Sequence, residues 1–326
     1  MGTKNLKHYL VKFQSIIALL IMCIVLSFLS DKFLTGENAW NVMRQISVNL
    51  IISVGMTLVI LTGGIDLSVG SILALAGAVT AGMLKFGAEF TDLNLYLGFT
   101  LLGAFVGGTL VGTVLGWFNG ITITRFKVPP FVATLAMLTI ARGLTMLLTG
   151  GFPITGLGEE MAFIGTGWFL GIPMPVWISA VIVVAAVILT KRTKLGRHIY
   201  AIGGNETAAR LSGLKIKRVK LIVYSIAGAL AGIGGIIVTS RLDSAQPNAG
   251  LGFELDSIAA VVIGGTSLSG GKGTILGTVQ GALIIGILNN GLVLLNVSPF
   301  WQQVIKGFVI LLAVVVEKVS SREETT

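Results

Sequence analysis

The chain has 326 residues, of which 54% are hydrophobic and only 11% charged, and it carries a net charge of +9. A soluble domain has about a quarter of its residues charged, so this composition excludes an ordinary soluble protein and favours a membrane protein with many spans. The single Cys23 excludes a disulfide framework, and neither it nor the two isolated histidines predicts a metal site.

Apolar segments follow one another along the whole chain, and about ten of them are long enough to cross a bilayer or nearly so. We expect an all-α polytopic membrane protein with a single transmembrane domain over residues 1–326 and an uncleaved first span. The eighth segment is short and bounded by glycine, which indicates a broken or re-entrant element that protein must bury. The segments lie near 13–30, 47–62, 69–86, 95–118, 131–149, 175–190, 221–240, 256–268, 274–294 and 301–317.

The distribution of positive charge predicts the topology. Cytoplasmic segments of membrane proteins carry an excess of Lys and Arg. With the N-terminus inside, most of the 23 basic residues fall on inner segments, so we expect both termini in the cytoplasm of a multi-pass inner-membrane protein. The excess of positive charge therefore indicates the topology of the spans. We expect membrane lipid around the spans and no nucleic-acid partner. The exceptions are Lys32, Arg44, Lys85 and Arg241 outside, and Arg142 and Lys306 within spans.

Residues 191–220 form a basic segment with nine Lys or Arg. A short helix is predicted inside it, because an Asn that can cap is followed by Glu in the first turn, by an apolar face of Ala208, Ala209 and Leu211, and by a terminating Gly. We expect a cytoplasmic loop that presents this helix to a peripheral protein. The residues concerned are Gly203, Gly204, Asn205, Glu206, Ala208, Ala209, Arg210, Leu211 and Gly213.

Two glycine-rich segments resemble each other. Residues 63–70 and 264–271 both read GGxxLSxG and both precede an apolar helix. Internal duplication is one explanation, and glycine-interrupted spans in matching halves are typical of transporter pathways; chance similarity in a glycine-rich chain is the other. The second segment also resembles the end of a phosphate-binding loop, but Thr266 and Gly273 stand where Gly and Ser or Thr are required. We therefore expect any ATP hydrolysis to come from another subunit.

Charged residues within or beside the spans raise the free energy of membrane insertion. Arg142 lies past the middle of the fifth span, where an arginine costs about 2.5–3.5 kcal/mol, so we expect it to face the bundle interior. Asp66 and Asp256 are its candidate partners, and a structural pair and a substrate ligand both remain open. We expect Lys306 to extend to the outer interface. Asp66 and Ser68 are expected to cap the third span.

Uncharged polar residues on the spans have two interpretations. They either line a neutral hydrophilic pathway or bond one helix to another. No catalytic constellation is present, so an enzyme is not expected. An ion-coupled secondary transporter and a non-transporting receptor are the competing classes. A secondary transporter does not need a capped helix in its basic loop, and a receptor does not predict an internal duplication. The residues concerned are Asn49, Thr57, Thr134, Gln280, Asn289 and Asn290.

Four long stretches carry a resemblance to a known family. They include SVGMTLVILTGGIDLSVGSILAL (53–75) and TKLGRHIYAIGGNETAARLSG (193–213), with further matches over 244–278 and 282–295. The chain resembles the permease subunits of ABC sugar importers, in the branch that serves ribose and related monosaccharides. Members for xylose, galactose, allose or autoinducer-2 share these motifs, so the motifs alone leave the sugar open.

This resemblance implies the remaining parts of a transporter. It implies a homodimeric permease, two cytoplasmic ATPase domains that bind ATP and Mg, and a periplasmic or lipid-anchored sugar-binding protein. It assigns residues 203–213 to the coupling helix that docks on the ATPase, and it leaves this chain without a cofactor of its own. Alternating access is the implied mechanism. The binding protein is then expected to dock on 31–46, 150–174 and 241–255.

Overall fold

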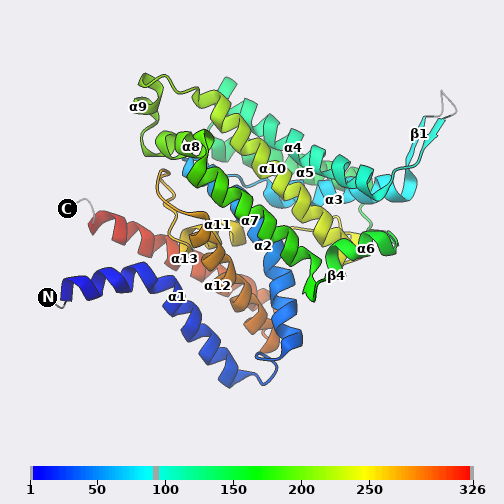
Figure 1. Cartoon of the computed structure of the whole chain (residues 1–326). Coiled ribbons are helices and arrows are strands. Elements are labelled where there is room, and N and C mark those ends of the chain that lie inside the picture. The colour runs from blue at the N-terminus through cyan, green and yellow to red at the C-terminus, as the bar shows by residue number, and fades with distance from the viewer. Residues whose placement is uncertain (1–2, 91–94, 324–326) are drawn as a thin grey trace.

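The computed structural model describes residues 3–90 and 95–323, and it is almost wholly helical (Figure 1). The extreme termini, which are predicted to be cytoplasmic, lie outside these residues. The helices are α1 (Thr3–Leu29), α2 (Gly36–Leu61), α3 (Val69–Phe86), α4 (Leu101–Arg125), α5 (Pro130–Thr149), α6 (Glu159–Thr166), α7 (Met174–Arg192), α8 (Lys194–Gly204), α9 (Glu206–Leu211), α10 (Ile216–Arg241), α11 (Phe253–Ile263), α12 (Ile275–Leu294) and α13 (Pro299–Glu323).

Three short antiparallel strand pairs connect the helices within the described part of the chain. β1 (Ala88–Phe90) pairs with β2 (Leu95–Leu97), and β4 (Trp168–Phe169) pairs with β5 (Ile172–Pro173). β3 (Ile154–Thr155) pairs with β6 (Ser244–Ala245), with Ile154 opposite Ala245. This last pair joins two segments far apart in the sequence, and both were predicted to face the outside.

Seven helices among the described residues are long and apolar enough to cross a membrane, namely α2, α3, α4, α5, α7, α10 and α12. α1 and α13 contain shorter apolar stretches, Ile16–Leu29 and Pro299–Val315. The 11 residues of α11 span about 16 Å, roughly half of a hydrocarbon core of ~30 Å, as expected for a broken element. Each predicted segment thus has a helix, although the fourth begins only after Thr100, which caps α4.

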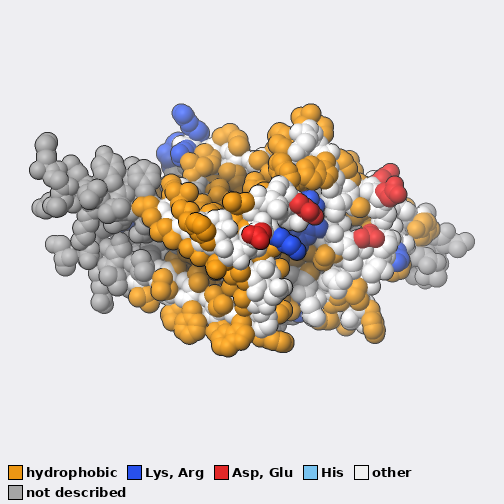
Figure 2. Space-filling view, turned by 90° about the horizontal axis from the view of Figure 1, so that it is seen from below, with side chains coloured by type: hydrophobic (Ala, Val, Ile, Leu, Met, Phe, Trp, Pro, Cys, Tyr) orange, Lys and Arg blue, Asp and Glu red, His pale blue; other side chains and the backbone are white. Residues whose placement is uncertain are grey.

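The centre of the bundle is formed by α2, α3 and α10. Every residue of α2 from Ile46 to Leu61 is buried, and α10 packs against α2, α3 and α4. In α4, α5 and α7, by contrast, only 22%, 28% and 22% of the apolar stretch is buried. Figure 2 shows a face covered largely by hydrophobic side chains, with charges gathered in a few places. A helix that is apolar all round and yet exposed requires a lipid or protein neighbour.

α4 and α10 approach each other through glycine. Along α4, Gly108, Gly112 and Gly116 are buried at four-residue steps, so they share one face of the helix. A Cβ atom on Gly112 would stand 2.3 Å from the carbonyl oxygen of Gly228, and one on Gly116 would stand 2.2 Å from that of Tyr224. Small residues of this kind let membrane helices pack backbone against backbone.

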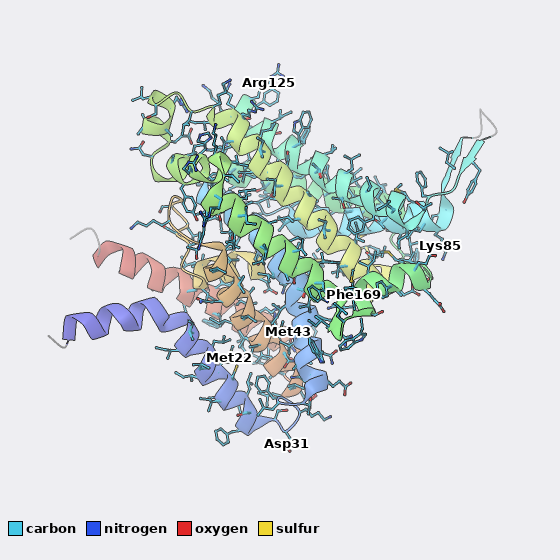
Figure 3. All side chains as sticks on the ribbon, in the orientation of Figure 1. Met22, Asp31, Met43, Lys85, Arg125 and Phe169 are labelled. Atoms are coloured by element: carbon cyan, nitrogen blue, oxygen red, sulfur yellow. The ribbon has the colours of Figure 1, made fainter. Side chains whose placement is uncertain are left out.

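The two ends of the bundle differ. α8 and α9 lie at one end, together with Arg125 at the end of α4, whereas Asp31 and Lys85 lie away from them (Figures 1 and 3). α6 and the β4–β5 hairpin also lie at the end remote from α9. α1 begins and α13 ends on the side of α8 (Figure 1).

Substituting alanine for Gly116 should destabilise the bundle, because the new methyl group collides with the α10 backbone. Overpacking of this kind costs about 1–3 kcal/mol. The measurement is the thermal unfolding midpoint of the detergent-solubilised protein. Gly143→Ala is the matched control, because no heavy atom lies within 4 Å of a Cβ at that position. Equal midpoints for the two variants would contradict the packing of α4 on α10.

Candidate functional site

The predicted short helix in the basic segment is present as α9. Asn205 has an extended backbone, and its side-chain oxygen accepts a hydrogen bond from the amide of Ala208 at 2.9 Å. This bond satisfies one of the free amides that begin a helix. At the other end, Gly213 has a φ of 82°, and Leu214 donates its amide to the carbonyl of Ala209 at 3.1 Å. This closure is a Schellman motif, which stops the helix after two turns.

The expected apolar face of α9 is divided between two environments. Ala209 is only 5% exposed and packs into the bundle core, whereas Leu211 is 85% exposed. Ala209 therefore anchors α9 to its own chain and offers nothing to a partner, which corrects the prediction of one continuous face. Leu211, with exposed Ala208, is what remains for a peripheral protein.

Glu206 fixes α9 relative to α10. Its carboxylate accepts from Lys220 on α10 at 2.7 Å and from Arg210 on α9 at 2.9 Å. The hydrogen bond from Lys220 lowers the pKa of the Glu206 carboxyl. A lowered pKa stabilises the folded state above the unfolded pKa, and this contribution disappears only as the pH falls through the lowered value. At neutral pH the pair is therefore fully formed.

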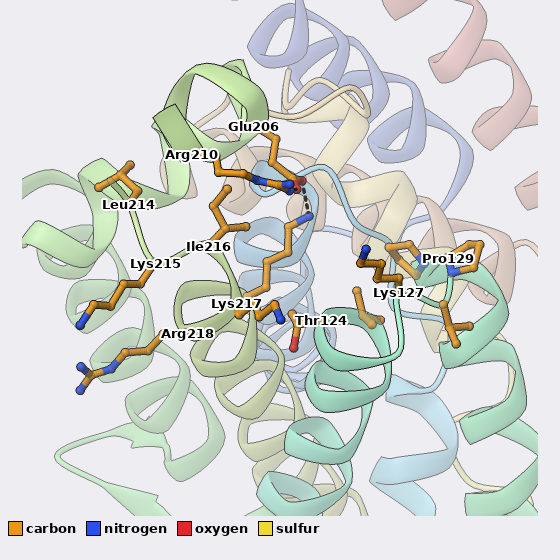
Figure 4. A pocket seen from close by; sticks show the side chains of 14 residues that line it. Thr124, Lys127, Pro129, Glu206, Arg210, Leu214, Lys215, Ile216, Lys217 and Arg218 are labelled. Atoms are coloured by element: carbon orange, nitrogen blue, oxygen red, sulfur yellow. Dashed lines mark hydrogen bonds and ion pairs between the residues drawn. The ribbon is translucent and has the colours of Figure 1, made fainter. Parts of the chain in front are cut away.

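A groove of about 870 Å³ opens beside α9. Lys127 and Pro129, on the turn between α4 and α5, lie across it from Glu206 and Arg210, which point toward each other (Figure 4). Apolar atoms form most of its wall, and basic side chains dominate its charged lining. Its basic residues are Lys127, Arg210, Lys215, Lys217, Arg218 and Lys220.

The end of α8 is in backbone contact with both glycine-rich segments. A Cβ on Gly203 would stand 1.8 Å from the carbonyl oxygen of Leu61 and 2.4 Å from the amide nitrogen of Gly271. Gly271 donates that amide to the same Leu61 oxygen at 3.1 Å. Gly270, with a φ of 87°, approaches Gly63 and Gly203. We call this contact of Leu61, Gly63, Gly203, Gly270 and Gly271 the glycine junction.

A second bond ties α8 to the segment before α12. Tyr200 donates its hydroxyl to the carbonyl oxygen of Gly273 at 2.8 Å. α8 also leads directly into α9, because Asn205 ends one helix and caps the next. α8 and the adjoining α9 are therefore held directly against the turns that precede α3 and α12. The two turns are built alike: in each, a glycine with positive φ, Gly63 or Gly265, directly follows the helix cap. In the GGxxLSxG alignment, however, Gly63 corresponds to Gly264 rather than to Gly265, so the duplication remains a prediction.

The predicted polar group at the start of α3 is buried and bonded. Asp66 accepts from the amide and the hydroxyl of Ser68, at 2.9 and 2.5 Å. Asn119 on α4 donates to the Ser68 hydroxyl at 2.9 Å. Asp66 thus holds the turn before α3, as expected, but Ser68 makes no side-chain cap, which corrects that part of the prediction. Asn119 was missed because it falls just beyond the expected end of the fourth span.

Arg142 does not pair with either aspartate that was expected. It donates to the backbone carbonyls of Pro247 and Ala249, at 2.6 and 2.9 Å, and so faces the interior. Asp256 instead pairs with Lys306 at 3.0 Å, so Lys306 does not extend to the outer interface. Burial explains why Lys306 pairs with Asp256, because a charged side chain on a span has a lower free energy when it is paired with a buried carboxylate than when it is unpaired.

The uncharged polar residues divide into two groups. Asn290 exchanges hydrogen bonds with Asn38, at 2.8 and 3.1 Å, and Thr57 meets Thr278 at 2.7 Å, so these residues bond helix to helix. Thr134 donates to backbone carbonyls, including Ile65 at 3.3 Å. Gln280 is half-buried on α12.

The other group is brought together by the fold. Asn49 and Asn289 line one cavity of about 110 Å³, which the Asp256–Lys306 pair also lines. Gln45 and Gln302, which the sequence analysis did not single out, contribute further amides.

A bundle of apolar helices with buried polar contacts is the fold of a polytopic membrane protein. The family described as "Branched-chain amino acid transport system / permease component" matches residues 38–314. The chain therefore belongs to this family.

Several curated permeases are similar to the chain over nearly its whole length. The ribose import permease protein of Escherichia coli (strain K12) is 50% identical over 317 residues, 95% of each chain. That of Bacillus subtilis (strain 168) is 51% identical over 312 residues, 95% of this chain and 94% of the relative. The D-allose transport system permease protein of Escherichia coli (strain K12) is 39% identical over 303 residues, which are 93% of this chain and 90% of the relative. These relatives are transport permeases rather than enzymes.

Alanine at Gly203 should disrupt the glycine junction, because its methyl group has no space beside the Leu61 carbonyl. We expect Gly203→Ala to lower the thermal unfolding midpoint and the yield of folded protein. Gly204→Ala is the adjacent control, since a Cβ there meets nothing within 4 Å. If both variants behave as the wild type does, α8 does not make this contact.

Proposed function

We propose that the chain is the transmembrane subunit of an ATP-driven importer that moves a monosaccharide, ribose first among them, across the inner membrane by alternating access. One observation carries the proposal: identity of 50% and 51% to two ribose import permeases over 95% of the chain. The D-allose relative has 39% identity and a xylose relative 32%, which favours ribose among the sugars.

The family description names branched-chain amino acids, but the interior polar groups favour a sugar. A branched aliphatic side chain requires an apolar pocket. The cavity next to Asn49 and Asn289 mixes four apolar side chains with four amides, Arg241 and an ion pair, so it is more polar than a pocket for an aliphatic side chain needs to be.

α9 is our candidate for the coupling helix. Leu211 offers an exposed apolar side chain, and the adjacent groove adds both apolar and basic surface for a cytoplasmic ATPase. ATP and Mg are assigned to that ATPase, so this chain needs no cofactor. Movement of α9 then passes through α8 and the glycine junction to the turns before α3 and α12.

The remaining parts of the transporter follow from the same assignment. We place both termini in the cytoplasm and propose ten crossings, the eighth of which is made by the short helix α11 together with the non-helical residues 264–274 that follow it. The exposed apolar faces of α4, α5 and α7 are assigned to lipid and to a second copy of the chain. The β3–β6 and β4–β5 pairs, at the end remote from α9, are our candidate docking surface for the sugar-binding protein.

Reconstitution of the complete transporter tests this function. The permease is purified with its ATPase and placed in vesicles, with the binding protein added outside. Loaded with ribose, the binding protein should raise ATP hydrolysis and drive ribose uptake more strongly than allose or xylose does. Uptake driven by leucine alone, or uptake without any ATPase, would overturn the proposal.

Leu211→Asp should uncouple the transporter, because a charge replaces the exposed apolar contact of α9. We expect uptake to fall about tenfold, which corresponds to ~1.4 kcal/mol of lost docking energy. The unfolding midpoint should not change, since Leu211 is exposed. Leu211→Met is the control that keeps an apolar side chain. Normal uptake by Leu211→Asp would exclude α9 as the coupling helix.

A further inference from the structure

The groove beside α9 lies where the membrane spans end. It is lined by the last turn of α4, by residues 127–130 of the turn that leads into α5, and by the first residues of α10. α4, α5 and α10 are all long and apolar enough to cross a membrane. Basic residues at the end of a span lie at the level of the lipid headgroups. The groove therefore opens beside the headgroups of the leaflet that α9 faces.

The groove holds more positive charge than the chain itself neutralises. Six basic side chains line it against a single acid, Glu206, whose carboxylate is already bound by Arg210 and Lys220. The other four basic residues make no ion pair with any residue that the structure describes, so the groove attracts an anion. They are Lys127, Lys215, Lys217 and Arg218.

Two of these four residues project from different walls of the groove. Figure 4 shows Lys217 of α10 beside Thr124 of α4, with Lys127 on the turn across from them, whereas Lys215 and Arg218 point away from Lys127. Lys127 has a φ of 58°, a left-handed backbone that is uncommon for a residue with a side chain. The fold therefore accepts local strain at the residue that brings an ammonium group to this edge of the groove.

The groove also continues the exposed apolar surface of α4 and α5. Apolar atoms form most of its wall. Phe126, directly before Lys127, is 68% exposed, and Phe131, at the start of α5, is 54% exposed. Both helices carry further apolar side chains that no residue of this chain covers. An occupant with a negative head and an apolar tail therefore matches both the groove and the surface beside it.

Smaller or purely apolar ligands match only one part of this surface. The volume of about 870 Å³ lies near the upper end of the roughly 300–1,000 Å³ of small-molecule pockets. Inorganic phosphate satisfies the lysines but leaves the apolar wall uncovered. An uncharged aliphatic molecule covers the wall but leaves the lysines without a counter-charge. A phospholipid supplies both chemistries, and basic pockets between spans on the cytoplasmic side are typical binding sites for anionic headgroups.

We propose that this groove binds an anionic phospholipid of the cytoplasmic leaflet, with its phosphate between Lys127 and Lys217 and its acyl chains along the exposed faces of α4 and α5. The proposal rests on the cytoplasmic position of α9 in the function proposed above, and it assigns a specific lipid class to the groove. Leu211 does not line the groove. That side chain and the exposed rim at Arg210 remain for the ATPase.

The bound lipid connects two elements of the cytoplasmic end. Lys127 belongs to the α4–α5 turn and Lys217 to α10, so a phosphate between them links the turn to α10. Lys220, one turn further along α10, binds Glu206 of α9. A ligand that binds the folded state alone raises the stability of that state. Anionic lipid should therefore stabilise the whole region around the coupling helix.

Binding is measured on the purified full-length permease after its lipids have been removed in detergent. Phosphatidylglycerol, phosphatidylcholine and inorganic phosphate are titrated separately, with native mass spectrometry to count bound lipid and the thermal unfolding midpoint as the second readout. Phosphatidylglycerol should bind and raise the midpoint, whereas phosphatidylcholine and phosphate should do neither. Equal effects of the two lipids, or the full effect with inorganic phosphate, would overturn the site.

A matched pair of double variants separates this site from general surface charge. Lys127→Gln with Lys217→Gln should weaken phosphatidylglycerol binding about thirtyfold, because each lysine near an anionic lipid contributes roughly fivefold. Lys191→Gln with Lys194→Gln removes the same charge from exposed positions outside the groove and should bind as the wild type does. Unchanged unfolding midpoints in phosphatidylcholine establish that both variants fold. Equal weakening of binding in the two double variants would refute the site.

Photocrosslinking shows where the lipid lies. Phosphatidylglycerol with a photoreactive acyl chain should label residues 117–132 of α4 and α5, and this labelling should persist when the ATPase is bound. Displacement of the lipid by the ATPase would assign the groove to that protein and overturn the proposal. A reconstituted transporter that imports ribose without binding phosphatidylglycerol refutes only this site. A permease that binds the lipid but moves no monosaccharide with its ATPase and binding protein refutes only the proposed function.

Discussion

Backbone meets backbone closely where Gly203 of α8 packs on Leu61 and Gly271, leaving no space for a Cβ atom. In an apolar bundle every carbonyl and amide that leaves a helix needs a partner, because lipid supplies none. The end of α2 and the loop between α11 and α12 satisfy part of this requirement together, with Gly271 donating its amide to the carbonyl of Leu61. A side chain at Gly203 would separate them. The positions of α3, α8 and α12 all depend on this contact.

The same contact connects the two ends of the molecule. α9 is short, doubly capped and held by Ala209 and Glu206, so it moves with α8 rather than independently. α8 reaches both glycine-rich turns, and the helices on either side of those turns carry Asn49 and Asn289. If α9 is the coupling helix proposed above, these contacts form a continuous route from Leu211 to the polar cavity.

The sequence predicted what depends on local chemistry. The cap at Asn205, the stop at Gly213 and the half-length of α11 follow from residues next to one another, and the structure contains all three. It did not predict contacts made across the bundle. Arg142 binds carbonyl oxygens, which every residue carries, so no residue type could identify Pro247 and Ala249. Asn49 and Asn289 lie 240 positions apart, and only the packing of α2 on α12 shows that they share a cavity while Asn290 does not. Ala209 and Leu211 differ in role although both are apolar, because α9 rests on α10 and only one of them faces it.

The most direct test of this account is to determine the structure of the assembled transporter without nucleotide and with ATP bound. The distances from the Leu61 oxygen to the Gly271 amide and to Gly203 would be compared between the two states. The account predicts that these distances stay the same while α9 and the turns before α3 and α12 move together. A junction that opens when ATP binds, with α9 moving alone, would contradict it.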